Sequence, residues 1–176
     1  SSIVSLDSNE TLIKAIPIEK FDDTRFILAV SKLGQIKRSS LSEYQVQRYS
    51  RALNTMNLKK GDQLVYIDLV TQEDEVFIAT LNAYAVRFNM DEVPVTGVKT
   101  GGVKGINLKD GDVVVNATTI PAGARGDLFL VTHRGAVKKM SLKEFEQGTR
   151  GKRGIVVLRE LKSNAHRVSG VFYVQD

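Results

Sequence analysis

The chain has 176 residues, 42% of them hydrophobic, with no cysteine and a formal net charge of +5. It contains no apolar run long enough to cross a bilayer, and residues 1–10 lack the basic start and apolar core of a signal peptide. Without cysteine it can form neither disulfides nor thiolate metal sites, which fits a reducing cytoplasm.

The positive charge is concentrated near the C-terminus. Residues 121–176 contain 11 Lys or Arg against 5 Asp or Glu, whereas the rest of the chain is close to neutral. A local excess of cations favours nucleic acid or another polyanion as a partner. The alternatives are an acidic protein partner and a merely solvated surface.

Two sequence patterns recur together at a spacing of about 50 residues. An apolar run, a turn and nearby cations occur at 26–41, 76–90 and 128–142, and the M-N-L-K-K-G-D-Q-L of 56–64 returns as I-N-L-K-D-G-D-V-V at 106–114. This period is typical of a propeller-like blade, a small antiparallel sheet that buries its faces only against neighbouring copies. Since few segments have helical periodicity, the predicted fold class is all-β, with residues 1–176 forming a single domain or part of one.

The first 24 residues are expected to be a partial blade. Their apolar patterns predict strands over 3–6 and 12–18, and Pro17 indicates that the second is an edge strand or breaks at this residue. A partial unit at the start suggests that the chain is a piece of a longer protein.

Residues 25–75 are expected to form the first complete blade. An apolar run leads to Gly34, which suits a tight hairpin because glycine adopts positive φ freely, and Lys37 and Arg38 follow this turn. A helical turn or loop, a strand, a Gly-Asp turn and a further strand are then predicted at 41–49, 52–58, 60–62 and 63–70.

The next blade is predicted over residues 76–126. Aligning its hairpin with the others places Ala83 or Tyr84 at the position of glycine, so its turn must differ or be strained. Arg87 takes the place of Lys37. A glycine-rich loop, a strand and a linker are then expected at 91–104, 113–120 and 121–126.

The last blade, residues 127–176, is predicted to turn at Gly135 before Lys138 and Lys139, with strands at 155–158 and 168–174. Its loop at 147–154 contains three glycines and three cations. Glycines allow close backbone approach, and the cations could then reach a flat anionic surface such as duplex phosphates. The glycine spacing and the strand expected next exclude a P-loop.

The sequence offers no catalytic constellation. His133 and His166 have no metal-ligand spacing and are expected to be turn or surface residues. Asp62 and Asp112 occupy equivalent Gly-Asp turns, which predicts a role in shaping those turns. Neither interleaved aromatic residues nor a recognition helix is visible, so binding should be directed at the backbone, dependent on salt and weakly specific for sequence.

Taken together, the repeated hairpins of the form T/S-x-x-G-x-V-K-R and the G-V-K-G-I-N-L-K-D-G-D of 102–112 resemble the C-terminal domain of the A subunit of bacterial type IIA DNA topoisomerases. The gyrase A subunit carries a box reading Q-R-R-G-G-K-G. The stretch at 147–154 reads Q-G-T-R-G-K-R-G, a degenerate version, and 45–53 has no glycine, so the chain looks more like topoisomerase IV than gyrase.

The resemblance implies a β-pinwheel of four-stranded blades that exchange strands with their neighbours and bind and bend duplex DNA on a basic outer rim. It implies that this domain is not itself an enzyme, although the parent is ATP-dependent. Arg48-Tyr49 is similar to the pair that cleaves DNA, but in the family that pair lies in another domain, so Tyr49 is expected to be a loop residue. The expected DNA-binding residues are Lys37, Arg38, Arg48, Arg51, Arg87, Lys99, Lys104, Lys138, Lys139, Arg150, Lys152 and Arg153.

The resemblance also sets expectations for partners and location. The partners would be double-stranded DNA, the remainder of the A subunit and the B subunit, with no membrane. No cofactor is expected in this domain, because ATP and Mg act elsewhere in the parent enzyme. The location would be cytoplasmic and associated with the chromosome.

Overall fold

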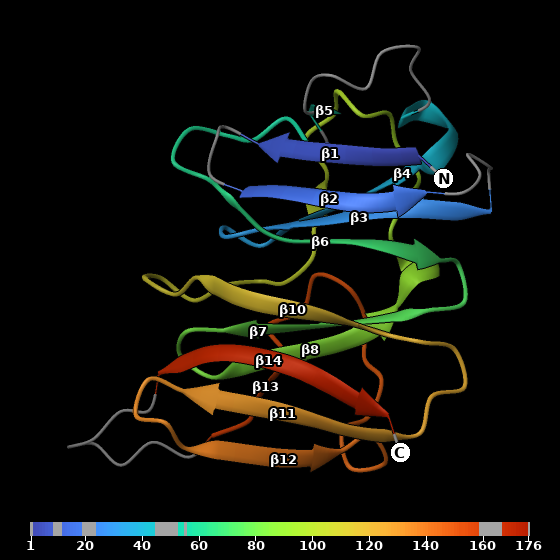
Figure 1. Ribbon diagram of the computed structural model, residues 1–176. Helices are drawn as coiled ribbons and strands as arrows, with labels where there is room; N and C mark the ends of the chain where they lie inside the picture. The colour runs from blue at the N-terminus through green and yellow to red at the C-terminus, as the bar shows by residue number, and fades with distance from the viewer. Residues whose placement is uncertain are drawn as a thin grey trace.

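The computed structural model describes residues 2–8, 12–18, 24–44, 53–54, 56–158 and 167–175, the first two and 53–54 as backbone alone. The described residues form four small sheets that follow one another from β1 and β2 at the top of Figure 1 to β11 and β12 at the bottom. We call these sheets blades 1 to 4. Within the described part of the chain, no helix is long and apolar enough to span a membrane.

Each blade is built around antiparallel neighbours. Blade 1 has the order β2-β1-β5, and its β2 is an edge strand that contains Pro17, as predicted. Blades 2 and 3 have the orders β6-β3-β4-β9 and β10-β7-β8-β13, and blade 4 has the order β12-β11-β14. The strand bounds are β1 Ser2–Ser8, β2 Leu12–Ile18, β3 Arg25–Ser31, β4 Gln35–Ser40, β5 Leu53–Asn54, β6 Leu64–Thr71, β7 Glu75–Thr80, β8 Tyr84–Asn89, β9 Val103–Lys104, β10 Val114–Ile120, β11 Gly126–Thr132, β12 Val137–Ser141, β13 Ile155–Val156 and β14 Val168–Gln175.

The structure differs in part from the prediction for the region between β4 and β6. Of the helical turn or loop expected at 41–49, Leu41–Tyr44 is a short 3-10 helix, and residues 45–49 lie outside the described residues. The strand expected over 52–58 is wrong in its extent, since β5 spans only Leu53–Asn54 and the chain at 56–58 is irregular.

Neighbouring blades exchange a short strand, as the resemblance implied. β9 follows the hairpin of blade 3 in the chain, yet it pairs with β4 of blade 2. β13 follows the hairpin of blade 4 but pairs with β8 of blade 3. Each exchanged strand therefore occupies the outermost position of the preceding blade, and each complete blade contains residues from two repeats of the sequence.

A glycine precedes each of these exchanged strands at the same repeat position. Gly102 and Gly154 have φ of 82° and 81°. A Cβ added at Gly102 would lie 2.6 Å from the carbonyl oxygen of Ile36, and one at Gly154 would overlap the carbonyl of Ala85. Any side chain at either position would therefore push the incoming strand away from its host blade.

Apolar clusters between the blades hold the stack together. One cluster joins β3 to β7 and β8 and includes Leu28, Val30 and Ile78, which are fully buried. A second joins blade 3 to blade 4 through Phe77 and Leu130. Because β7 contributes to both clusters, its residues are buried on both faces, which explains its continuous apolar run.

The hairpin turns follow the repeat, including its irregular copy. Gly34 and Gly135 have φ of 89° and 80°, and Ala83 stands at the same place with φ of 67°. Ala83 is the one described residue other than glycine with positive φ, so the predicted strained turn is confirmed.

The two Gly-Asp turns are also confirmed as structural elements. The Oδ1 of Asp62 accepts hydrogen bonds from the backbone N–H groups of Leu33 and Gln63. The Oδ1 of Asp112 accepts from those of Asn82 and Val113 in the same arrangement. Each buried carboxylate thus joins its own turn to the hairpin turn of its blade.

Candidate nucleic-acid interface

We call the edge strands β9 and β13, together with β12 at the edge of the described part of blade 4, the rim. The loop at 147–154 leads from β12 to β13 and contacts the segment around β9. The guanidinium Nη1 of Arg150 donates to the carbonyl of Lys104 at 2.8 Å. The backbone N–H of Gly151 donates to Gly105, and that of Asn107 donates to the carbonyl of Lys152. The loop is therefore fixed against the segment that supplies β9, and it brings its cations beside Lys104.

Exposed cations from three parts of the sequence gather around β13. Lys152 and Arg153 are exposed and are separated from this strand by Gly154 alone. Lys138 and Lys139, both exposed on β12, line a shared hollow with Ile155 and Val156. The exposed members of the predicted set that meet along this rim are Lys104, Lys138, Lys139, Lys152 and Arg153.

The ammonium groups of two of these exposed lysines also contact other residues of the protein. The ammonium of Lys138 donates to the carbonyl of Val157, and that of Lys139 lies 3.3 Å from Oδ2 of Asp127. The Lys139 side chain is still 66% exposed, so its ion pair is weak and can exchange for an external anion.

The prediction is wrong for Lys37 and Arg38, which are not on an accessible rim. They are 1% and 5% exposed. Burial lowers the pKa of Lys37 to about 8, although the negative charge of Glu43 opposes this shift. The Arg38 guanidinium lies 4.5 Å from the centre of the Phe26 ring, and its Nε donates to the carbonyl of Val93. Both side chains face the interior because their strand is covered by neighbouring elements.

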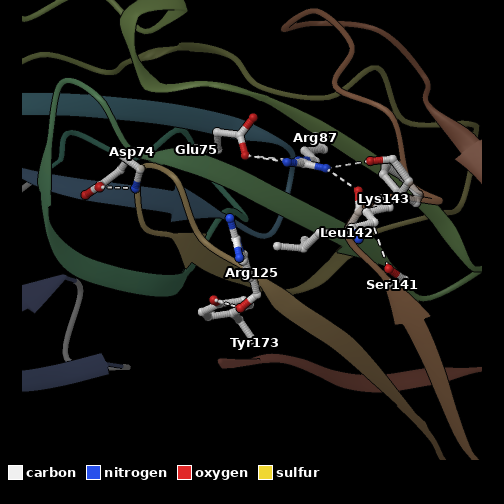
Figure 2. A network of polar contacts seen from close by, with 10 residues as sticks. Asp74, Glu75, Arg87, Arg125, Ser141, Leu142, Lys143 and Tyr173 are labelled. Atoms are coloured by element: carbon white, nitrogen blue, oxygen red, sulfur yellow. Dashed lines mark hydrogen bonds and ion pairs between the residues drawn. The ribbon is translucent and has the colours of Figure 1, made fainter. Parts of the chain in front are cut away.

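Arg87 is likewise part of the protein framework. Figure 2 shows its guanidinium between Glu75 on one side and the segment that includes Leu142 on the other. The Nη2 of Arg87 lies 2.6 Å from Oε2 of Glu75, and its Nη1 donates to the carbonyls of Leu142 and Phe145. With the side chain only 14% exposed, this arginine ties blade 3 to the turn that follows β12.

Of the other cations predicted to bind DNA, those that the structure describes are not exposed members of the rim. Arg150 is committed to the carbonyls of Glu92 and Lys104, so we treat it as the anchor of its loop. Lys99 is exposed in a turn, and no described contact connects it to the β13 rim. Arg48 and Arg51 lie outside the described residues, as do Tyr49 and His166.

The structure adds positions at the rim that the sequence reasoning missed. Lys109, Arg167, Asn82 and Tyr84 line a hollow of about 300 Å³ beside Val156. The ammonium of Lys109 lies 5.0 Å from the centre of the Tyr84 ring. Lys109 belongs to the repeated N-L-K segment, so the repeat could have signalled it. No pattern points to Arg167.

The described segments contain no candidate metal centre. They contain no group of three or more His, Cys, Asp or Glu side chains able to hold a metal ion, and His133 is exposed at a hairpin turn.

A family model described as the DNA gyrase C-terminal domain, beta-propeller, matches residues 25–71, 74–121 and 126–175. The chain belongs to this family. Among curated proteins it is 45% identical over 172 residues to the A subunit of DNA topoisomerase 4 from Bacillus subtilis, and 37% identical over 169 residues to its counterpart from Streptococcus pneumoniae. These alignments cover 98% and 95% of this chain but only 21% and 20% of the relatives, so the chain spans about a fifth of their length.

Solved structures agree with this placement. A crystal structure of the C-terminal domain of DNA topoisomerase IV is 47% identical with a TM-score of 0.86, and the match covers 93% of this chain and 50% of that one. A DNA gyrase A C-terminal domain has a TM-score of 0.77 at 21% identity, covering 93% and 53%, and supports the fold alone. The predicted resemblance is thus confirmed, as are the pinwheel-like fold and the preference for topoisomerase IV over gyrase.

Proposed function

We propose that this chain is a non-catalytic domain that binds and bends duplex DNA for a type IIA topoisomerase of the topoisomerase IV kind. The observation that carries the proposal is the gathering of exposed cations around β13, on the outer edges of consecutive blades. By holding a segment of duplex away from the catalytic core, the domain would influence which DNA topologies that core acts on.

Electrostatics should dominate this interaction. Among the described residues the rim offers lysine and arginine side chains but no helix for the major groove, so contacts would go mainly to phosphates. Each phosphate neutralised releases counterions and contributes about 0.9 to the slope of log K against log salt. Binding should therefore be steeply dependent on salt and nearly independent of sequence.

The test is a titration of the chain with labelled duplex at several salt concentrations. The double variant Lys152→Ala/Arg153→Ala is expected to lower the salt slope by about 2, as the loss of two phosphate contacts requires. The single variant Arg153→Ala should lower the slope by about 1. Its matched control is Arg125→Ala, which removes one exposed arginine just before β11 and should leave the slope unchanged. An unchanged slope in the double variant would remove the loop from the interface.

Failure of the unmodified chain to bind duplex at low salt would refute the proposal and favour an acidic protein partner. Titration with duplexes of increasing length provides a second check, since bending predicts a rise in affinity once the DNA spans more than one blade.

The proposal extends to the parent protein. Its other partners would be the rest of the A subunit and the B subunit, in a cytoplasmic enzyme associated with the chromosome. ATP and Mg would act in those other parts.

A further inference from the structure

The exchanged strand β13 presents two aliphatic side chains to solvent in the middle of the basic rim. Ile155 and Val156 are 56% and 53% exposed. At the equivalent position of blade 2, reached by aligning Gly102 with Gly154, Val103 is partly buried against the core and Lys104 is exposed. Val156 therefore occupies a place where the preceding repeat has a lysine, and both residues of β13 are exposed.

Hollows that contain cations surround this apolar ridge. On one side Ile155 and Lys152 line a hollow of about 390 Å³. On another, Lys138 and Lys139 share a hollow of about 180 Å³ with both ridge residues. Lys109 and Arg167 line the hollow of about 300 Å³ that contains Val156. Cations thus line all three hollows, and the exposed carboxylates of Glu144 and Glu146 share the two hollows that Lys138, Lys139 and Lys152 line.

The backbone beneath the ridge is held firmly. Gly154 lies directly against the carbonyl of Ala85, and the N–H of Val157 donates to the carbonyl of Ala83 at 2.8 Å. Ile155 and Val156 pair with Ala85 and Tyr84 of β8. Because the backbone is already ordered, a side chain on this strand can contact a ligand at a low cost in conformational entropy.

We propose that Val156, with Ile155 beside it on the same exposed edge strand, forms a wedge that enters the minor groove of duplex DNA and partly unstacks one base step. The inference rests on the proposed function and specifies how the domain bends its ligand. Cations on either side of the ridge would contact the phosphates of the two strands that border the groove. Apolar wedges of this kind bend DNA toward the major groove, and the deformation is easiest at pyrimidine–purine steps. The cations around the ridge favour this polyanion over an apolar protein surface.

The experiment compares the full chain with Ile155→Ser/Val156→Ser on two short duplexes, one with a central TA step and one with an A-tract. End-labelled DNA reports bending by energy transfer, and 2-aminopurine beside the TA step reports unstacking. The unmodified chain should bend the TA duplex, raise the 2-aminopurine signal and prefer this duplex by roughly 3- to 10-fold. The double variant should lose all three effects while keeping its salt slope, because the cations remain.

Two further variants make the result specific. Val174→Ser changes an aliphatic residue that is 45% exposed on β14, at the edge of blade 4 opposite β12, and should behave like the unmodified chain. Val156→Lys restores the residue type of blade 2 and should steepen the salt dependence while weakening the bend. It also keeps the test valid if the serine variant folds poorly.

The outcomes separate this inference from the proposed function. Equal bending and unstacking by the unmodified chain and the serine variant would overturn the wedge and leave DNA binding intact. Binding of the unmodified chain without any unstacking would do the same. Absence of duplex binding by the unmodified chain would overturn both, and a partner protein would then be sought for the ridge.

Discussion

Gly154→Ala is the most direct perturbation of the strand exchange, and Gly111→Ala is its matched control. Both glycines have φ of 81°, so an alanine at either position carries the same backbone strain of about 1–2 kcal/mol. Part of this cost, about 0.4–1 kcal/mol, is offset because alanine restricts the unfolded chain. The expected loss for Gly111→Ala, where an added Cβ meets nothing within 4 Å, is therefore about 1 kcal/mol.

At Gly154 the added methyl group would overlap the carbonyl oxygen of Ala85, and neither backbone can move away while β13 stays paired. Displacing β13 breaks its pairing with β8 and the hydrogen bond from Val157 to Ala83. At about 0.5–1.5 kcal/mol for each bond, the further loss is about 2–4 kcal/mol.

Urea unfolding followed by circular dichroism measures both free energies of unfolding. Gly102→Ala, at the equivalent position of blade 2, should resemble Gly154→Ala because its Cβ would lie 2.6 Å from a carbonyl oxygen. If Gly154→Ala and Gly111→Ala lose the same stability within about 0.5 kcal/mol, the exchanged strand does not constrain this position and the reasoning is refuted.

Three other predictions concern buried charge. Asp112→Ala leaves two backbone N–H groups without their acceptor and should cost about 2–4 kcal/mol in urea unfolding, whereas Asp112→Asn retains an acceptor and should cost less. Arg87→Ala should cost about 2–4 kcal/mol of stability, because it breaks the contacts with Glu75 and two carbonyls. It should leave the salt slope of DNA binding unchanged. A reduced slope would show that Arg87 contacts DNA. Because burial lowers the pKa of Lys37 to about 8 from 10.5, the unfolded state binds more protons between these values, and stability should rise with pH across this window. Lys37→Met should lack that rise relative to the unmodified chain, and parallel pH profiles for the two would contradict the assignment.

The order of elements could be predicted from the sequence because it depends on local patterns. Apolar runs ended by Gly34 and Gly135 specify hairpins, and the spacing of the Gly-Asp turns specifies the repeat. The sequence also showed that the second hairpin turn must differ or be strained, with Ala83 or Tyr84 at the position of glycine, and the structure identifies Ala83 as the residue with positive φ.

The rim was harder to predict because equivalent repeat positions have different surroundings. Lys37 and Lys138 occupy the same place after their turns, yet the first is buried and the second is exposed. Blade 2 packs on both faces, whereas β12 lies at the edge of blade 4 within the described residues. Burial is set by the neighbouring sheet, which the local sequence does not encode.

The sequence by itself determined the class of the protein: a repeated β unit, its turns and its excess of positive charge, all of which depend on residues close together in the chain. Only the tertiary structure decided which blade receives β13, and with it the apolar ridge among the cations. The sequence predicts a strand at 155–158 but not its partner, because the pairing with β8 depends on a glycine that fits against a carbonyl about 70 residues away in the chain.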